Sequence, residues 1–464
     1  MSILAIVVSL LLLMFLAYRG ISVLLLAPLM AGLAVLLSGD AAFLLPIYTD
    51  TFMSALGNYV IQFFPLFLLG ALFGQLMADS GAAQSIANGI VKKLGTHHVV
   101  LTVVMVCAVL TYGGVSLFVV AFAIYPISRE LFRSADVPKR LIPASIALGS
   151  FTFTMTALPG TPAIQNAIPI PYFATNSFAA PGLGIIAGII MLGLGTYYLQ
   201  SRVRKAAANG EGYGQHTERE VDSSDASLGE AHMPLALAII PLLMVIGLNA
   251  LFTYGVFPAM DLSFISAAFE NVSPSAQSGL WAILIALLSA SAWLIITRWK
   301  HWQNLKESVN KGCLGSLLPI FNTASEVGYG AVIASLAGFA IIRDTVLSAS
   351  PGNPLISEAM AMSVLAGITG SSSGGLSIAL GTLGSEYLAM AEQAGINPEL
   401  MHRVATLAAG GMDTLPHSGA VITLLAICGL THRQSYAHVA MVTIALPIVA
   451  LISVITLGTV FGSF

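Results

Sequence analysis

Long apolar runs separated by short polar breaks extend over nearly the whole chain of 464 residues. A helix needs about 20 mostly apolar residues to cross the hydrocarbon core of a bilayer. By this criterion the pattern predicts crossings at 2–17, 20–38, 54–78, 138–175, 182–203, 234–255, 279–297, 312–340, 400–429 and 438–462. Proline and glycine lie near the centres of 138–175 and 400–429, which predicts that both helices are broken. The chain is therefore predicted to be an all-α polytopic membrane protein.

Two further apolar stretches, 97–131 and 355–390, are interrupted midway by small residues. The first interruption is Leu110–Ser116 and the second is Gly370–Ser377. Each arm has about 16 residues, a length that is marginal for crossing a bilayer. Each stretch is therefore either one re-entrant hairpin or a pair of short crossings. In both cases the chain returns to the side from which it came.

A polar stretch from Arg204 to His232 divides the chain into two units, which we predict at 1–203 and 234–464 with a linker at 204–233. Three short motifs recur in the same order in both units, at offsets of 254, 261 and 257 residues: Phe64-Pro65-Leu66-Phe67 with Leu318-Pro319-Ile320-Phe321, Gly113-Gly114-Val115-Ser116 with Gly374-Gly375-Leu376-Ser377, and Leu158-Pro159 with Leu415-Pro416. Each unit has an odd number of full crossings. The units are therefore predicted to be inverted-topology repeats, each of five crossings plus one re-entrant hairpin, with broken helices at the midplane.

The composition supports a membrane protein and excludes other classes. Hydrophobic residues make up 57% of the chain and charged residues 8%, against about 25% charged residues in soluble proteins. So few charges cannot cover the surface of a soluble enzyme, and a net charge of −3 provides no basic surface for a nucleic acid. The three cysteines lie far apart, so we expect neither a disulfide framework nor a metal site, and no cofactor.

The basic residues orient the chain in the membrane. In the predicted threading, all but two of the 18 Lys and Arg fall on the side of the linker, and Arg343 and Arg403 are the two exceptions. The positive-inside rule makes the linker side cytoplasmic. Both termini are then expected on the periplasmic side of a bacterial inner membrane.

The break in the first unit is Thr156-Ala157-Leu158-Pro159-Gly160-Thr161-Pro162, followed by Ala163-Ile164-Gln165-Asn166. We expect the next half-helix to begin at about Thr161, with Thr161 as N-cap and Pro162 at its first position. Such a helix start favours an anion. The alternative is a structural kink. With the hairpin serine, this break gives the first-unit candidates for substrate binding, Ser116, Thr161 and Asn166.

The break in the second unit, Gly410–Gly419, adds the ionisable residues Asp413 and His417. Ionisable groups within a membrane are costly and mark a pathway or proton relay by default. The alternative is a structural ion pair between them, and two ligands alone do not make a zinc site. Glu326, in the span 312–340, has no obvious local partner. Glu326, Asp413 and His417 are therefore the candidates for proton coupling.

The hairpin of the second unit adds serine hydroxyls beside glycines, which let a ligand approach the backbone closely. The alternative is close helix packing by small residues. The second-unit candidates for substrate binding are Ser373, Gly375 and Ser418. The sequence has no Lys or Arg well inside a predicted crossing. An anionic substrate would then meet helix N-termini, amides and hydroxyls, which favours a monoanion over a more highly charged substrate.

The segments 154–166, 374–377 and 413–419 resemble those of the gluconate:proton symporter (gluconate permease) family of the ion transporter superfamily, and the resemblance runs over nearly the whole chain. It implies proton-coupled import of sugar acids or short hydroxy acids. It also implies re-entrant hairpins and a homodimer that moves by an elevator mechanism. The stretch Asn322–Gly330 resembles members associated with hydroxybutyrate-type acids more than the gluconate-specific branch.

The leading hypothesis is a secondary transporter for a small organic monocarboxylate such as gluconate or hydroxybutyrate, coupled to H+. Sodium, held by hydroxyls and unwound carbonyls, is the alternative coupling ion. An anion channel fits less well, because paired breaks and buried carboxylates argue against an open pore. An intramembrane enzyme would need Asp413, His417 and Ser418 for nucleophilic chemistry. Adjacent residues such as His417 and Ser418 are poorly placed for a general-base contact.

Overall fold

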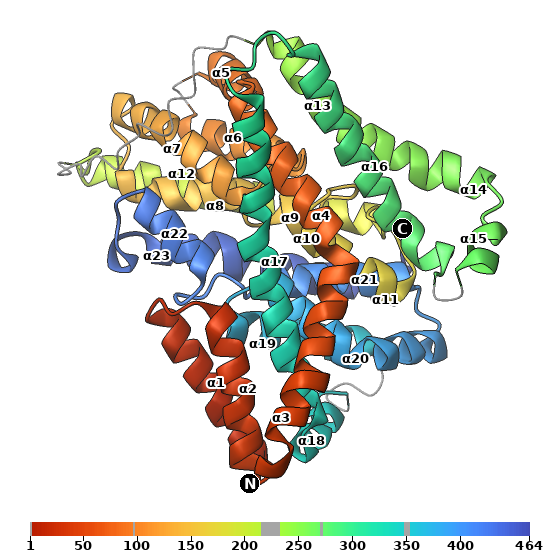
Figure 1. Cartoon of the computed structure of the whole chain (residues 1–464). Coiled ribbons are helices and arrows are strands. Elements are labelled where there is room, and N and C mark those ends of the chain that lie inside the picture. The colour runs from red at the N-terminus through yellow and green to blue at the C-terminus, as the bar shows by residue number, and fades with distance from the viewer. Residues whose placement is uncertain (1, 96–97, 215–232, 270–271, 348–352) are drawn as a thin grey trace.

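The computed structural model of the chain describes residues 2–95, 98–214, 233–269, 272–347 and 353–464 (Figure 1). Every regular element within these ranges is helical. The acidic run 218–222 of the predicted linker lies outside the described residues. Five of the described helical segments are long and apolar enough to cross a membrane, at Ala41–Asp79, Pro181–Ala208, Leu235–Ala259, Pro274–Thr297 and His432–Phe461. They lie at predicted crossings.

The first unit begins with two short apolar helices, α1 (Ser2–Tyr18) and α2 (Val23–Ser38), which pack against each other and against α17 or α18 of the second unit. Short segments η1 (Ala41–Phe43), α3 (Leu44–Pro46) and the π-helical η2 (Ile47–Phe52) then lead into a long helix. The remaining helices of this unit are α4 (Met53–Asp79), α5 (Ala82–Leu94), α6 (Val99–Tyr112), α7 (Leu117–Ser134), η3 (Lys139–Leu141), α8 (Ile142–Ser150), α9 (Phe153–Thr156), α10 (Ile164–Ala167), α11 (Ile170–Phe173) and α12 (Pro181–Ala208).

The second unit has a similar series of long helices, hairpin and broken helix. Its helices are α13 (Leu235–Ala250), η5 (Leu251–Val256), α14 (Phe257–Ala259), α15 (Ser263–Ala268), α16 (Pro274–Thr297), α17 (Leu305–Ser335), α18 (Ala337–Leu347), α19 (Pro354–Thr369), α20 (Ser372–Ala394), α21 (Pro398–Gly410), α22 (Gly419–Ile427), α23 (His432–Ala440), η6 (Met441–Ala445) and α24 (Leu446–Phe461). The predicted crossing 312–340 ends earlier than expected, because α17 stops at Ser335 and the chain bends by 97° into α18.

Two long helices, α4 and α17, pack against each other through the centre of the molecule (Figure 1). Pro65 lies inside α4 and Pro319 inside α17. A proline inside a helix removes one backbone hydrogen bond and bends the helix locally. The two matching prolines therefore lie in the two helices, one from each unit, that pack against each other at the centre of the molecule.

The two hairpins are alike, but their register differs from the one predicted by the Gly-Gly match. In the first, Gly114 takes a positive φ of 100° and Ser116 precedes α7. In the second, Gly370 takes a positive φ of 65° and Ser371 precedes α20, while Gly374 and Gly375 lie inside that helix. The equivalent glycines are therefore 256 residues apart and the equivalent serines 255. These offsets agree with those of the other two motifs better than the offset of 261 does.

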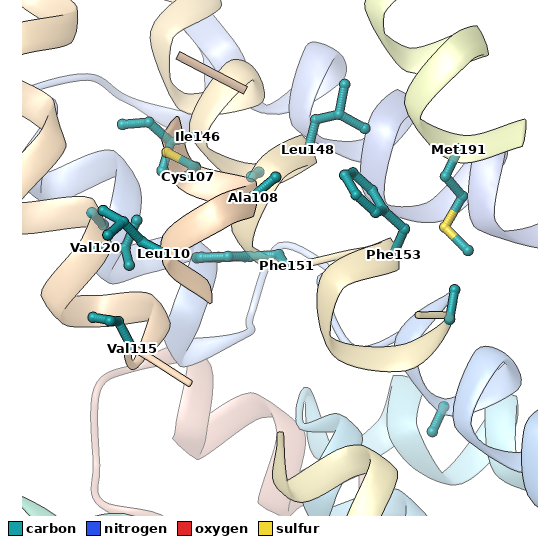
Figure 2. Close-up of a cluster of buried hydrophobic side chains, with 14 of the residues drawn as sticks. Cys107, Ala108, Leu110, Val115, Val120, Ile146, Leu148, Phe151, Phe153 and Met191 are labelled. Atoms are coloured by element: carbon teal, nitrogen blue, oxygen red, sulfur yellow. The ribbon is translucent and has the colours of Figure 1, made fainter. Parts of the chain in front are cut away.

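The first hairpin is held by a dense apolar core between α6 and α8 (Figure 2). Leu110, Val120, Ile146 and Leu148 are completely or almost completely buried there. Gly149 allows a close approach of α8 to α6, because a Cβ at this position would lie 2.5 Å from the Val104 carbonyl oxygen and 2.5 Å from the Cys107 Cβ. Close packing of this kind makes any change in side-chain volume costly, so this core fixes the hairpin against the start of the first broken helix.

Candidate functional site

The tip of the second hairpin ends in a capped helix N-terminus. Gly370 turns the chain with its positive φ, and the Ser371 Oγ accepts a hydrogen bond from the Gly374 backbone N–H at 3.1 Å. This is the usual N-cap interaction, which satisfies one of the free N–H groups of the first turn. The helix α20 continues for 23 residues, so its dipole places partial positive charge at Ser371–Gly374.

Glu326 reaches this helix start from α17 and is 5% exposed. Its carboxyl group lies against Gly374, since a Cβ at Gly374 would collide with Oε2 and lie 2.6 Å from Cδ. Ser371 lies beside the same carboxyl group, close enough to interact with it electrostatically. Oε2 is buried and has no hydrogen-bond partner within the described part of the chain. Thr323, one turn earlier, places its Oγ1 3.4 Å from the Ser373 Oγ.

Asp413 reaches the same helix start from the break between α21 and α22. Its carboxyl group lies beside Ser372, close enough to interact electrostatically with the hydroxyl and the backbone N–H of that residue. Gln165, from the break of the first unit, donates from Nε2 to the Ser372 Oγ at 3.0 Å. The Asp413 Oδ1 and the Gln165 Oε1 are buried and find no partner among the described residues. Two carboxyl groups, one from α17 and one from the break after α21, thus lie beside neighbouring serines at one helix N-terminus.

His417 and Ser418 lie at the same hairpin tip, on Gly370. A Cβ at Gly370 would lie 3.0 Å from the His417 Cδ2 and 3.2 Å from the Ser418 Cα. The His417 Nε2 lies 3.2 Å from the Ile368 carbonyl oxygen. Across the described ranges, no ion pair joins His417 to Asp413, so the structural pairing considered as an alternative does not form. The Ser418 Oγ is buried and has no partner in these ranges.

The first break differs from its sequence-based prediction. The half-helix α10 begins at Ile164 with Ala163 before it, and it has only four residues. Thr161 is therefore not an N-cap, although it is fully buried, and its hydroxyl oxygen lies 3.4 Å from the Ala163 backbone nitrogen. The half-helix α10 is short because Pro169 follows closely and a second short helix, α11, begins after it. A helix this short has too small a dipole to hold an anion.

Asn166 is fixed on both ends of its amide. Its Nδ2 donates to the carbonyl oxygens of Thr161 and Ser177, at 3.1 and 2.7 Å. Its Oδ1 accepts from the Arg403 Nη1 at 3.2 Å and lies 3.3 Å from the His402 Nε2. All its polar atoms are thus engaged within the protein. Its predicted contact with the substrate stays a prediction.

Arg403 corrects the expectation that no basic residue lies inside the helical bundle. Its side chain is completely buried and donates to the carbonyl oxygens of Thr156 and Ala179, at 3.0 and 2.8 Å. Thr406 donates to the same Thr156 oxygen at 2.8 Å. The sequence places Arg403 near the predicted start of a crossing, where it counts as a loop charge. Its position inside the fold follows from tertiary packing of α21 against the first break.

Two other predicted residues have clear structural surroundings. Gly375 packs against α19, because a Cβ there would lie 2.7 Å from the Leu365 carbonyl carbon. Ser116 precedes α7, and its backbone nitrogen would lie 3.3 Å from a Cβ at Gly74. Its neighbour Gly114 approaches the first break, with a Cβ position 3.0 Å from the Pro162 Cγ. Ser116 and Thr161 are thereby brought into one region, and Gly375 serves helix packing.

The structure therefore gathers Glu326, Asp413, Ser373, His417 and Ser418 around the start of α20. We call this the α20 cluster. Ser372 is one of the hairpin hydroxyls that the sequence offers beside glycines, although it is not among the predicted site residues, and Gln165 is the member that sequence reasoning missed. Gln165 lies within the quoted first break, so its position in a polar motif was a usable signal. No group of three His, Cys, Asp or Glu suited to a metal ion occurs in the described ranges. The arrangement suits binding of a small anion and exchange of protons.

Comparison with known proteins identifies relatives along the whole chain. Residues 1–460 match the family described as GntP family permease. The chain is 45% identical over 455 residues to an uncharacterized transporter, YxjC, of Bacillus subtilis, and the match covers 96% of each chain. It is 32% identical over 120 residues to the high-affinity gluconate transporter of Escherichia coli, which is 25% of this chain and 26% of that one.

A solved structure shows the same kind of fold. MtrF of Neisseria gonorrhoeae, which belongs to a class of antimetabolite efflux pumps, has a TM-score of 0.56 at 14% identity, over 91% of this chain and 85% of that one. A likeness at this identity concerns the fold alone. The predictions of an all-α polytopic membrane protein and of the family resemblance are confirmed by these matches.

Proposed function

Because the chain belongs to the GntP permease family, and is therefore a multi-pass membrane transporter and not an enzyme, we propose that it imports a small organic monocarboxylate together with a proton. The observation that carries the proposal is the convergence of Glu326 and Asp413 on one helix N-terminus. A sugar acid such as gluconate, or a short hydroxy acid such as 3-hydroxybutyrate, is the proposed substrate class.

The start of α20 supplies what a carboxylate ligand needs. Its first-turn N–H groups and dipole favour negative charge. Ser373, Ser418 and the Gln165 amide add hydrogen-bonding groups around it. A substrate with hydroxyl groups beside its carboxylate would find acceptors in the free oxygens of Gln165 and Asp413. Ser373 and Ser418 are the proposed contacts of the substrate in the second unit, and Ser116 and Thr161 those in the first.

The same two carboxyl groups couple substrate binding to protonation. Two like charges about 6 Å apart repel each other by about 3 kcal/mol at an effective dielectric constant of about 20. A substrate anion at the start of α20 would face such repulsion from each ionised carboxylate. Protonation of Glu326 or Asp413 removes it, so the proton and the substrate each increase the affinity for the other. His417, beside the same hairpin tip, is the proposed tuning residue.

The proposal extends to the cycle as a whole. The two units are proposed to be inverted repeats that alternate the access of the α20 cluster between the two sides, by an elevator movement within a homodimer. The protein is proposed to lie in a bacterial inner membrane with both termini periplasmic. Buried hydrogen bonds join Arg403, on the second broken helix, to the carbonyl oxygens of Thr156 and Ala179 in the first unit. They support a movement in which both broken helices travel together.

Reconstituted uptake tests the function. Purified protein in liposomes is given radiolabelled gluconate or 3-hydroxybutyrate, with an inward proton gradient and no sodium. The parent should accumulate one of them. Glu326→Gln and Asp413→Asn should abolish accumulation yet retain exchange of substrate at equal pH, because a carrier fixed in its neutral form still alternates when loaded.

The matched control is Glu392→Gln, which removes an exposed carboxylate from the far end of the same helix α20. It should accumulate substrate like the parent. If both Glu326→Gln and Asp413→Asn also accumulate substrate like the parent, the proposed proton carriers are wrong. If the parent requires sodium and ignores pH, sodium is the coupling ion.

A further inference from the structure

Behind the start of α20, polar side chains that the proposed mechanism does not use lie beside Glu326. Ser377 is 1% exposed and Tyr59 of α4 is 3% exposed. Neither hydroxyl oxygen has a hydrogen-bond partner within the described residues, and the Glu326 Oε2 has none either. Buried polar groups are nearly always hydrogen-bonded, so three unpaired oxygens in one region require a functional or structural explanation.

The positions of these residues on their helices bring them together. Glu326 Oε2 contacts Gly374 of α20. Ser377 is three residues further along, and residues three apart lie on the same helix face. The Tyr59 hydroxyl lies close enough to Ser377 and Glu326 to be influenced electrostatically by both, although neither hydroxyl makes a hydrogen bond within the described residues. Helices α4, α17 and α20 pack pairwise through α17, so the three oxygens share one buried junction.

The Tyr59 ring is held rigidly in this position. Its centroid lies 4.8 Å from that of Phe63 and 6.5 Å from that of Phe67. Aromatic packing of this kind fixes the ring while its hydroxyl hydrogen remains free to rotate. The hydroxyl can therefore change partner without any movement of the helix.

We propose that Tyr59 and Ser377 are positioning residues that stabilise the ionised form of Glu326 during the transport cycle. When Glu326 is protonated, Oε2 needs no donor, and this form is compatible with two hydroxyls that make no hydrogen bond to it. When Glu326 releases its proton, both hydroxyls rotate and donate to the carboxylate. Hydrogen bonds to a charged group are the strong ones, so these donors make proton release possible in a buried site. This inference rests on the proposed role of Glu326.

Few other charged groups act on Glu326 from the helices packed around it. Helix α17 packs mainly on α2, α4, η2, α18 and α20. Asp50 of η2 is exposed, and Arg343 and Asp344 of α18 form a surface ion pair. The remaining titratable neighbours are Asp413, which lies beside Ser372, and Tyr172 of α11, which lies near Tyr59. Besides Ser371 at the helix start, Tyr59 and Ser377 are thus the donors placed to respond to the charge of Glu326.

The test compares Tyr59→Phe and Ser377→Ala with the parent in liposomes. Both variants retain the shape of the side chain and remove one hydroxyl. Proton-driven accumulation is measured as a function of external pH, and substrate exchange is measured at equal pH. Loss of one hydrogen bond to a charged group should move the midpoint of the pH profile upward by about one unit, because Glu326 then retains its proton to higher pH. Exchange should be unchanged.

The matched control is Tyr329→Phe, which removes another buried hydroxyl from α17, three residues after Glu326. Its hydroxyl is already paired with the Ser9 Oγ at 3.0 Å, so the pH midpoint should stay at the parental value. If Tyr59→Phe and Ser377→Ala both keep the parental midpoint while Glu326→Gln abolishes accumulation, this inference is wrong and the proposed function stands. If Glu326→Gln accumulates substrate like the parent, the proposed function fails first.

Discussion

Replacing Gly374 by alanine tests the contact on which the α20 cluster depends. The added Cβ would overlap Glu326 Oε2 and lie 2.6 Å from Cδ, whereas nonbonded carbon atoms normally lie about 3.5–4 Å apart. The carboxyl group must therefore withdraw by about 1 Å or more. Overpacking a buried site lowers the free energy of unfolding by about 1–3 kcal/mol. Alanine in place of glycine inside a helix raises it by up to about 1 kcal/mol. We expect a net loss of stability of about 0–2 kcal/mol.

The functional effect should exceed the effect on stability. Because the Glu326 carboxyl group loses its place beside Ser371, Gly374→Ala should abolish proton-driven accumulation, while thermal unfolding in detergent shifts only modestly. Gly381→Ala is the matched control on the same helix, since its Cβ would meet only the Tyr172 hydroxyl oxygen at 3.8 Å. It should be neutral or stabilising and transport normally. If Gly374→Ala accumulates substrate with the parental pH profile, Glu326 does not act from this position.

Two further substitutions test the packing around the site. Arg403→Gln should destabilise the protein by about 3 kcal/mol or more in a thermal or urea unfolding assay. The reason is that it leaves the buried carbonyl oxygens of Thr156 and Ala179 without their donors. An unchanged unfolding midpoint would show that Arg403 does not join the two broken helices. Glu211→Gln should cost less than about 1 kcal/mol, because its pair with Arg140 is partly exposed. The hydrogen bond from Arg140 lowers the pKa of Glu211. The stabilisation from this ion pair should therefore be complete above the ordinary glutamate pKa and disappear as the pH falls through the lowered pKa. A difference in stability between parent and variant that persists in strong acid would contradict this expectation.

The positions of the long helices could be predicted from the sequence because apolar length is a strong signal. The predicted crossing 54–78 corresponds to α4 at Met53–Asp79, and 182–203 lies within α12. The breaks were equally visible, since proline and glycine interrupt helices for local reasons. Local signals did not reveal where helices restart. After Pro162 the chain forms two four-residue helices, α10 and α11, before the long helix α12 begins, and Pro169 separates the two short ones.

The side-chain contacts of the site depend on tertiary packing that sequence patterns do not contain. Glu326 and Asp413 were predicted as functional carboxylates, but their common helix N-terminus follows from the packing of α17 and α21 around α20. The sequence places Arg403 near the start of a crossing, as a loop charge, since neither its helix face nor its partners can be derived from its neighbours in sequence. Glycine patterns were ambiguous for a related reason. Gly370 and Gly374 both lie in a glycine-rich stretch, and only the structure shows which one turns the chain.

The coupled movement of protons and substrate is the most direct test of the central claim, that Glu326 and Asp413 link a proton to an organic anion at the start of α20. Liposomes with an internal pH indicator, equal pH on both sides and no sodium receive an inward gradient of gluconate or 3-hydroxybutyrate. The parent should acidify the interior as the substrate enters. Glu326→Gln and Asp413→Asn should exchange substrate without moving protons. Substrate entry by the parent with no change of internal pH would contradict the account.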